Sequence, residues 1–169
     1  RTYSAKSEFL IVRALCSRRR DVAGKIMATV DGEHFHTKEA SEAYSFIMKY
    51  VRTHGEAPAF DTLLEDPRLS EKARTSLSNI QGNIRNHAQL EQTLENLTQY
   101  KKTRACVRLS RMIAESIGED NIDIEELVTE IQQTAATLSL TKSLENTLFH
   151  IGRDSNVGDL IQDILYGED

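Results

Sequence analysis

Residues 86–118, NHAQLEQTLENLTQYKKTRACVRLSRMIAESIG, form the stretch that decides the expected fold. No glycine or proline interrupts it before Gly118, and Leu, Ala, Glu, Lys, Arg and Gln, which favour helices, dominate it. Asn86 and Gln89 form a capping-box-like start. A helix of this length would extend over roughly 45–50 Å. Its apolar side has a polar gap at Lys101 and consists of Leu90, Leu94, Leu97, Ala105, Leu109, Met112 and Ile113.

A second helix is expected to follow closely. Gly118 ends the first helix, and Asp123 with Glu126 has the spacing of another capping box. Two long helices that are joined by about five residues must run antiparallel. We therefore predict a helical hairpin over residues 86–139. The apolar stripe of its second helix consists of Ile124, Leu127, Val128, Ile131, Ala135 and Leu138.

Residues 1–85 contain shorter segments with helical periodicity, separated by turns. Thr37 is a suitable N-cap and Gly55 a suitable C-cap for the longest of them, and Pro58 prevents a restart. These segments predict a small globular head, and the fold class is expected to be all-α. The predicted short helices cover residues 7–17, 22–30, 37–55, 60–64 and 70–80.

Residues 140–169 are expected to form a linker with a short amphipathic helix near its end. Asn156 is the expected N-cap. An apolar stripe this far from the head needs a neighbouring surface to bury it, so we predict that it docks on one. The docking stripe consists of Val157, Leu160, Ile161, Ile164 and Leu165.

The composition is that of a soluble protein, with 39% hydrophobic and 28% charged residues among 169. Cys16 and Cys106 are isolated, which favours a reducing, cytoplasmic location over a disulfide framework. The longest apolar run, residues 9–12, is too short for a membrane span. The chain starts with Arg1 rather than Met, which favours a piece of a longer protein, although deliberate trimming would look the same.

The net charge of −5 is unevenly distributed. Residues 1–118 hold 19 Lys/Arg and 14 Asp/Glu, whereas residues 119–169 hold 2 Lys/Arg and 12 Asp/Glu. The acidic third is unsuited to nucleic acid. It fits a solvated helix face that pairs with the basic helix before it, and docking on a basic protein surface is the less favoured interpretation.

No catalytic, cofactor or metal site is expected within this chain. The phosphate-binding pattern G-x-x-x-x-G-K-[ST] is absent. His34 and His36 flank Phe35, but no further metal ligand converges on them in the sequence, so ordinary loop histidines are the favoured interpretation.

Two basic clusters remain. The first, a weak candidate for phosphate contact although a solvated loop is favoured, consists of Arg18, Arg19 and Arg20. The second is expected to pair across the hairpin or across a subunit interface, and consists of Lys101, Lys102, Arg104, Arg108 and Arg111.

Four segments in this order resemble the N-terminal part of DnaB-type replicative DNA helicases. They are EHFHTKEASEAYSFIMKYVRTHGEAPAFDTLLED (33–66), QYKKTRACVRLSRMIAESI (99–117), DIEELVTEIQQTAATLSL (123–140) and NVGDLIQDILYGED (156–169). The helicases of T-even-type phages are the most similar members. Ala40 and Ala43 depart from the family, which has His and Leu-rich positions there. The match in the first segment is carried by Phe35, Tyr44, Ile47, Tyr50, Gly55 and Pro58.

The resemblance implies a scaffold that forms the collar of a hexameric helicase and binds primase and the helicase loader. The linker helix would pack on a neighbouring subunit's ATPase domain. ATP and Mg would bind only to that ATPase domain. Single-stranded DNA would bind to the complete hexameric ring, and weakly or not at all to the segment given by this sequence. Two alternatives remain. The chain could be an independent helical adaptor that binds a host or replication factor, or a helical protein that binds nucleic acid. The residues expected to associate or dock through the hairpin are Leu109, Met112, Ile113, Ile124, Leu127 and Ile131.

Overall fold

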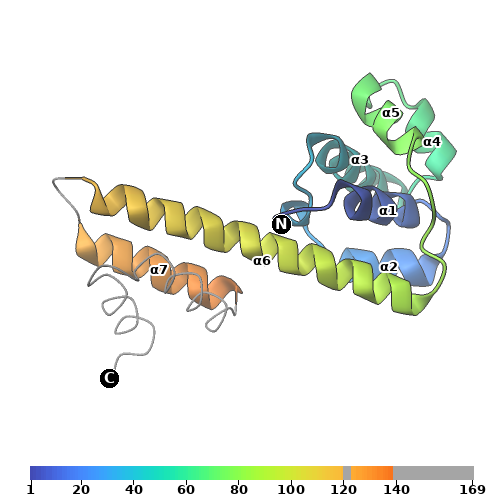
Figure 1. Ribbon diagram of the computed structural model, residues 1–169. Coiled ribbons are helices and arrows are strands. Elements are labelled where there is room, and N and C mark those ends of the chain that lie inside the picture. The colour runs from blue at the N-terminus through green and yellow to red at the C-terminus, as the bar shows by residue number, and fades with distance from the viewer. Residues whose placement is uncertain (120–122, 139–169) are drawn as a thin grey trace. The chain divides into compact units, whose positions relative to one another are not determined.

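The computed structural model describes residues 1–119 and 123–138, and within these ranges it is all-α, with no strand. The chain divides into two compact units, Arg1–Lys101 and Lys102–Asp169. The predicted fold class is thereby confirmed. The elements (Figure 1) are α1 (Ala5–Leu15), α2 (Arg20–Thr29), the 3₁₀ helix η1 (Gly32–His34), α3 (Lys38–His54), α4 (Phe60–Glu65), α5 (Glu71–Ser78), α6 (His87–Ile117) and α7 (Ile124–Leu138).

Local capping sets several of the helix ends. Ser4 accepts a hydrogen bond from the Ser7 backbone N at 3.3 Å and so starts α1. Ser70 does the same for α5, by accepting from the Ala73 backbone N at 3.1 Å. Gly55 ends α3 in the left-handed conformation (φ 79°), which costs glycine little because it has no Cβ.

The start of α2 differs from the prediction. The Arg-rich run was expected to be a polar break before residue 22, but α2 begins at Arg20 and includes Asp21 in its first turn. An acidic side chain there is favourable because it faces the positive end of the helix dipole. Residues 16–19 separate the two helices, and Arg18 among them adopts φ 61°.

The core of the first unit includes the N-terminal half of α6. Leu90, Leu94 and Leu97 are at most 3% exposed and belong to the same buried cluster as Ile11 and Ile47. Their spacing of three and four residues places them on one face of α6, which packs against the short helices. The compact unit therefore extends to Lys101, whereas the sequence suggested a boundary at residue 85.

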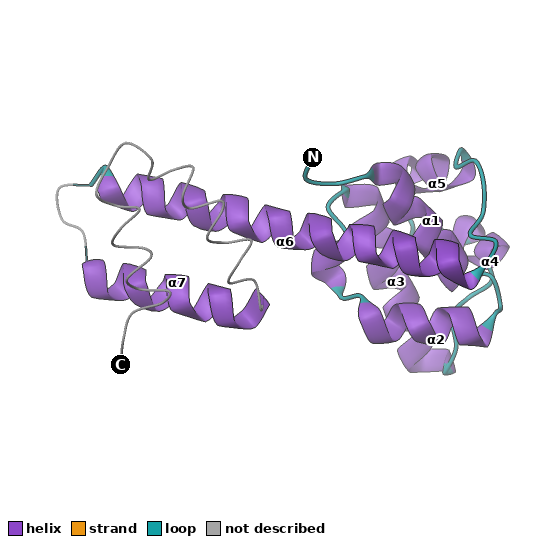
Figure 2. Cartoon of the chain, turned by 60° about the horizontal axis from the view of Figure 1, so that its bottom comes forward, coloured by secondary structure: helices purple, strands orange, loops and turns teal. Residues whose placement is uncertain are grey.

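The second unit pairs the end of α6 with α7. In Figures 1 and 2, α7 lies beside the C-terminal part of α6 and runs in the opposite direction. Asp123 accepts a hydrogen bond from the Glu126 backbone N at 3.1 Å, so the predicted N-cap of α7 is confirmed. No helix in residues 1–119 and 123–138 is both long and apolar enough for a bilayer crossing.

Candidate functional site

The residues predicted to associate through the hairpin fall into three groups in the second unit. Leu109, Ile113 and Ile131 are at most 3% exposed, so they hold their own unit together and are not available to a partner. Met112 and Leu127 are half-buried. Ile124 is 54% exposed and is the member of the set that a partner can reach most fully.

Two other large apolar side chains are also exposed among the described residues of this unit. Ile117 is 42% exposed at the end of α6, and Val107 is 39% exposed further back along that helix. Ile117 and Ile124 flank the connection between α6 and α7. We call these two residues the apolar tip. Sequence analysis did not predict Ile117 as an association residue. Its position in the last turn of the predicted helix could have indicated that its side chain is exposed.

The predicted docking stripe of the linker helix lies outside the described residues. This applies to Val157, Leu160, Ile161, Ile164 and Leu165 alike. The docking prediction for that segment therefore stays a prediction.

The three arginines of the first basic cluster line a surface hollow of the first unit with a volume of about 940 Å³. Arg18 is exposed in its left-handed backbone conformation. Arg19 lies 3.9 Å from the Asp21 carboxylate, and Arg20 lies 3.8 Å from that of Glu56. These long, exposed ion pairs contribute little to stability, so they leave the arginine side chains free to meet an external anion.

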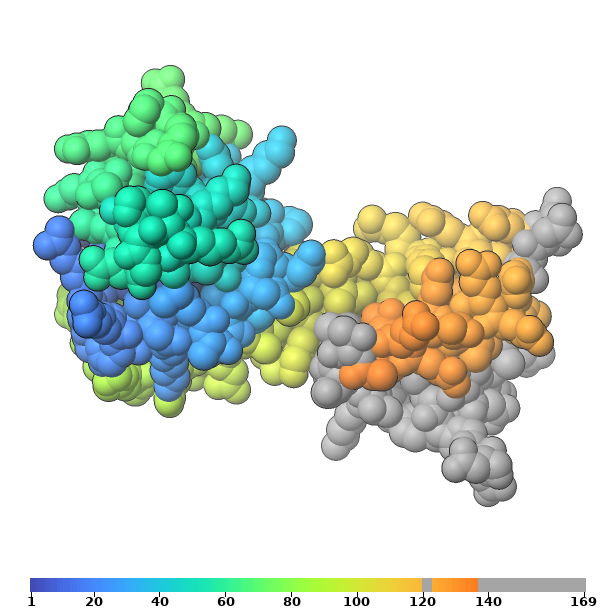
Figure 3. Space-filling view, turned by 180° about the vertical axis from the view of Figure 1, so that it is seen from behind, coloured from blue at the N-terminus to red at the C-terminus, as the bar shows by residue number. Residues whose placement is uncertain are grey.

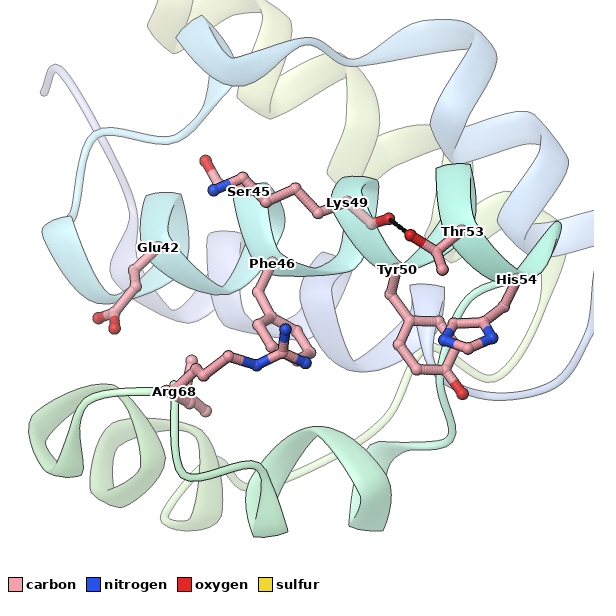
Figure 4. Close-up of a pocket in the computed structure, with 9 residues that line it drawn as sticks. Glu42, Ser45, Phe46, Lys49, Tyr50, Thr53, His54 and Arg68 are labelled. Atoms are coloured by element: carbon pink, nitrogen blue, oxygen red, sulfur yellow. Dashed lines mark hydrogen bonds between the residues drawn. The ribbon is translucent and has the colours of Figure 1, made fainter.

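A smaller hollow of about 340 Å³ lies along α3 and carries aromatic rings (Figure 4). The Arg68 guanidinium lies 5.0 Å from the centre of the Phe46 ring, and the rings of Tyr50 and His54 are 4.1 Å apart. The Arg68 guanidinium also donates two hydrogen bonds to Asp66, which lower the pKa of that carboxyl. Since Tyr50 and His54 line both hollows, the two hollows adjoin there.

His34 is a buried structural residue rather than the loop histidine that the sequence favoured. Its side chain is 5% exposed, and its Nδ1 accepts from the Asp31 backbone N at 3.0 Å. The ring proton then belongs on Nε2, which lies 3.3 Å from Thr98 Oγ1. Burial lowers the pKa of His34, despite the nearby Asp31 carboxylate. His36 is exposed, so the two histidines have different surroundings.

Lys101, which interrupts the apolar side of α6, forms an ion pair with Asp31, the neighbour of His34. Its Nζ lies 2.6 Å from Asp31 Oδ2, which ties η1 to α6 within the first unit. Although burial opposes it, the hydrogen bond from Lys101 lowers the pKa of Asp31. The prediction that this basic residue pairs across the hairpin or a subunit interface is wrong, because its partner lies in the first unit of the same chain.

Glu8 is a fully buried carboxylate that sequence analysis missed. Its Oε1 accepts hydrogen bonds from the backbone N of His36 at 2.8 Å and of Thr37 at 2.9 Å, and from Thr37 Oγ1 at 3.0 Å. It thus satisfies backbone groups just before α3, which Thr37 itself does not cap with its side chain. The available signal was an acidic residue directly before the apolar run 9–12.

Among residues 1–119 and 123–138, no three His, Cys, Asp or Glu side chains are grouped so that they could hold a metal ion. Burial raises the pKa of the Cys16 thiol to about 12, which makes it a poor nucleophile. Comparison of the chain with protein-family models, curated proteins and solved structures gives no significant match.

Proposed function

We propose that this chain is the N-terminal scaffold, oligomerisation and docking module of a hexameric, DnaB-type replicative DNA helicase. Its own surfaces would form the collar and bind primase and the loader. The chain itself would hydrolyse no ATP, because the phosphate loop and its Mg would belong to an ATPase domain outside this sequence. The location would be the cytoplasm of a bacterial or phage-infected cell.

The observation that carries the proposal is the apolar tip. Exposing Ile117 and Ile124 to water is unfavourable, by about 25 cal/mol for each Å² of apolar surface. Apolar side chains that gather at one place on a surface are typical of an interaction site, so we infer that another molecule covers this tip. A second copy offers the same residues, so the tips of two copies can cover each other across a two-fold axis.

The helical arrangement gives this proposal its second support. The resemblance implies a helical head followed by two antiparallel helices that pair between subunits. The described residues contain a helical first unit, and a second unit in which α7 runs back beside α6. Phe35 and Tyr44, which help to carry the resemblance, stack in the first unit with ring centres 4.6 Å apart.

Size-exclusion chromatography with light scattering tests the self-association. The whole chain, of 19.1 kDa, is expected to shift to a multiple of this mass between micromolar and near-millimolar concentration. The double variant Ile117→Ser/Ile124→Ser is expected to stay monomeric. The control Ala114→Ser/Ala136→Ser changes two exposed residues of the same helices and should associate like the wild type. A strictly monomeric wild type over this range contradicts the proposal.

The helicase assignment has a separate test in the gene. The reading frame is expected to continue beyond residue 169 into a domain with the phosphate-binding pattern G-x-x-x-x-G-K-[ST]. A stop codon directly after residue 169 in the natural gene would contradict the helicase assignment and favour the independent adaptor, whatever the oligomeric state.

A further inference from the structure

The two hollows of the first unit share the lining residues Tyr50 and His54, and together we call them the α3 groove. Its larger part lies between the turn that holds Arg18 and the turn that follows Gly55. Its smaller part continues along α3 to Arg68 (Figure 4). In Figure 3 the teal surface of the residues after α3 adjoins the blue surface of the N-terminal helices. The larger part, about 940 Å³, has the size of a binding site for a ligand or peptide side chains.

The groove is positively charged in a chain that is acidic overall. Two glutamates, Glu42 and Glu56, line it, against five basic residues, whereas the whole chain has a net charge of −5. The basic residues gather mainly at one end, where Arg20 is 91% exposed. The five are Arg18, Arg19, Arg20, Lys49 and Arg68.

Arg18 stands out because of its backbone. It is the one non-glycine residue with a positive φ among residues 1–119 and 123–138. A side chain other than Gly, Asn or Asp is unfavourable in this conformation. Arg18 therefore places a guanidinium at the rim of the groove at a backbone position that a glycine or asparagine would occupy with less strain.

The floor of the groove is apolar and aliphatic. Met27, Ala57 and Ala59 are half-buried there, and Leu15 and Pro58 are buried beneath the surface. Such a floor accepts leucine or isoleucine side chains, whereas the adjacent arginines accept carboxylates. The combination of an apolar floor and a basic rim complements an amphipathic segment with acidic residues.

Single-stranded nucleic acid fits the groove less well. Its binding sites offer free aromatic faces on which bases stack. Here the Tyr50 ring already lies 4.1 Å from the His54 ring, and Arg68 lies over Phe46. Glu42 and Glu56 would also repel a phosphate backbone that followed the groove.

We propose that the α3 groove binds an acidic, amphipathic peptide segment of a partner protein, with apolar side chains on the Met27–Ala57 floor and carboxylates on Arg18 and Arg20. The inference rests on the docking role proposed above and adds to it the surface and the chemical class of the partner. The apolar tip is a different surface in a different unit, so the two sites can be tested separately.

Fluorescence anisotropy of labelled synthetic peptides with the whole chain tests the inference. The acidic amphipathic probe EDLLEELLDE is expected to bind saturably. Two probes should not bind: EDSSEESSDE, which lacks the leucines, and KKLLKKLLKK, in which the charge is reversed. Equal binding of the serine probe, or tighter binding of single-stranded oligo-dT that displaces the acidic probe, would overturn the inference.

Matched variants locate the site. Arg18→Asn/Arg20→Gln is expected to weaken binding of EDLLEELLDE about fivefold, since each exposed charge pair contributes modestly. Asparagine tolerates the left-handed backbone, so folding is preserved. The control Arg52→Gln/Arg85→Gln removes the same charge from exposed positions outside the groove and should bind like the wild type. Equal weakening by both pairs would overturn the assignment to the groove.

The oligomeric state of the same samples separates the two proposals. Peptide binding by a strictly monomeric chain would contradict the collar proposal and leave the groove assignment intact. Self-association without binding of the acidic probe would contradict the groove assignment alone. The groove variant is expected to self-associate like the wild type, because it leaves Ile117 and Ile124 unchanged.

Discussion

Replacing Glu8 with alanine is expected to destabilise the first unit strongly. This carboxylate is fully buried, and its Oε1 accepts from the backbone N of both His36 and Thr37. Alanine cannot accept either hydrogen bond, so two backbone donors next to α3 would lose their partner. The side chain also fills space between α1 and the start of α3, which alanine would leave empty.

The magnitude follows from these contacts. A buried donor without an acceptor costs about 1–3 kcal/mol, so two such donors cost roughly 2–6 kcal/mol. One term offsets this loss, because Oε2 of Glu8 is buried without a hydrogen-bond partner in the described part of the chain and its desolvation is relieved. We therefore expect a net loss of about 2–4 kcal/mol. For a unit of this size, the melting temperature would fall by roughly 10–25 °C.

Glu8→Gln separates the contribution of the charge from that of the acceptor. Glutamine keeps an oxygen for the His36 and Thr37 donors but loses the strengthening that a negative charge gives to a hydrogen bond. It also places an amide NH₂ where Oε2 now lacks a partner. We expect a loss of about 1–2 kcal/mol, between the wild type and the alanine variant.

Urea unfolding of the whole chain, followed by circular dichroism and by tyrosine fluorescence, measures these differences. Glu95→Ala is the matched control, because Glu95 is exposed on α6, and it should change the stability by less than about 0.5 kcal/mol. A Glu8→Ala variant that unfolds within the same margin as this control would refute the reasoning.

Three further predictions follow from buried groups. Burial lowers the pKa of His34 in the folded protein, so the stabilising contribution of the neutral imidazole is complete above pH 6.5, the ordinary pKa of histidine in an unfolded chain, and is lost as the pH falls below it. The difference in urea midpoint between wild type and His34→Gln should therefore narrow from about pH 7.5 to about pH 5.5. A constant difference over this range would contradict a neutral, buried imidazole. In a Cys106→Ser background, the Cys16 thiol, with a pKa of about 12, should react with Ellman's reagent at pH 8 only after unfolding, and rapid labelling of the folded chain would contradict this. Leu94→Ala should lower the free energy of unfolding by about 2–5 kcal/mol in urea titrations, since Leu94 is 3% exposed; a loss below about 1 kcal/mol would show that α6 does not belong to the core of the first unit.

Helix ends were predictable wherever neighbouring residues decide them. Ser70 and Asp123 cap helices by reaching a backbone N three residues away, and Gly55 ends α3 through its own backbone freedom. The start of α2 was predicted at residue 22 instead of Arg20, because the run of three arginines was interpreted as a break between helices. Arginine is in fact a good helix former.

The candidate sites were less predictable, because burial depends on contacts between distant residues. The apolar stripe of the hairpin contained both buried Ile131 and exposed Ile124, which sequence periodicity does not distinguish. The α3 groove joins Arg18 to the turn after Gly55, and no local pattern relates these two segments.

The sequence by itself determined that this chain is helical and where most helices begin and end, because helix propensity, periodicity and capping act over a few residues. Only the tertiary structure decided which polar groups are buried. Glu8 meets the Thr37 backbone, and Lys101 meets Asp31, across separations of 29 and 70 residues. The physical reason is that hydrophobic burial is non-directional. A stripe of leucines therefore predicts that one face of a helix is covered, but only the packed fold shows which other residues cover it.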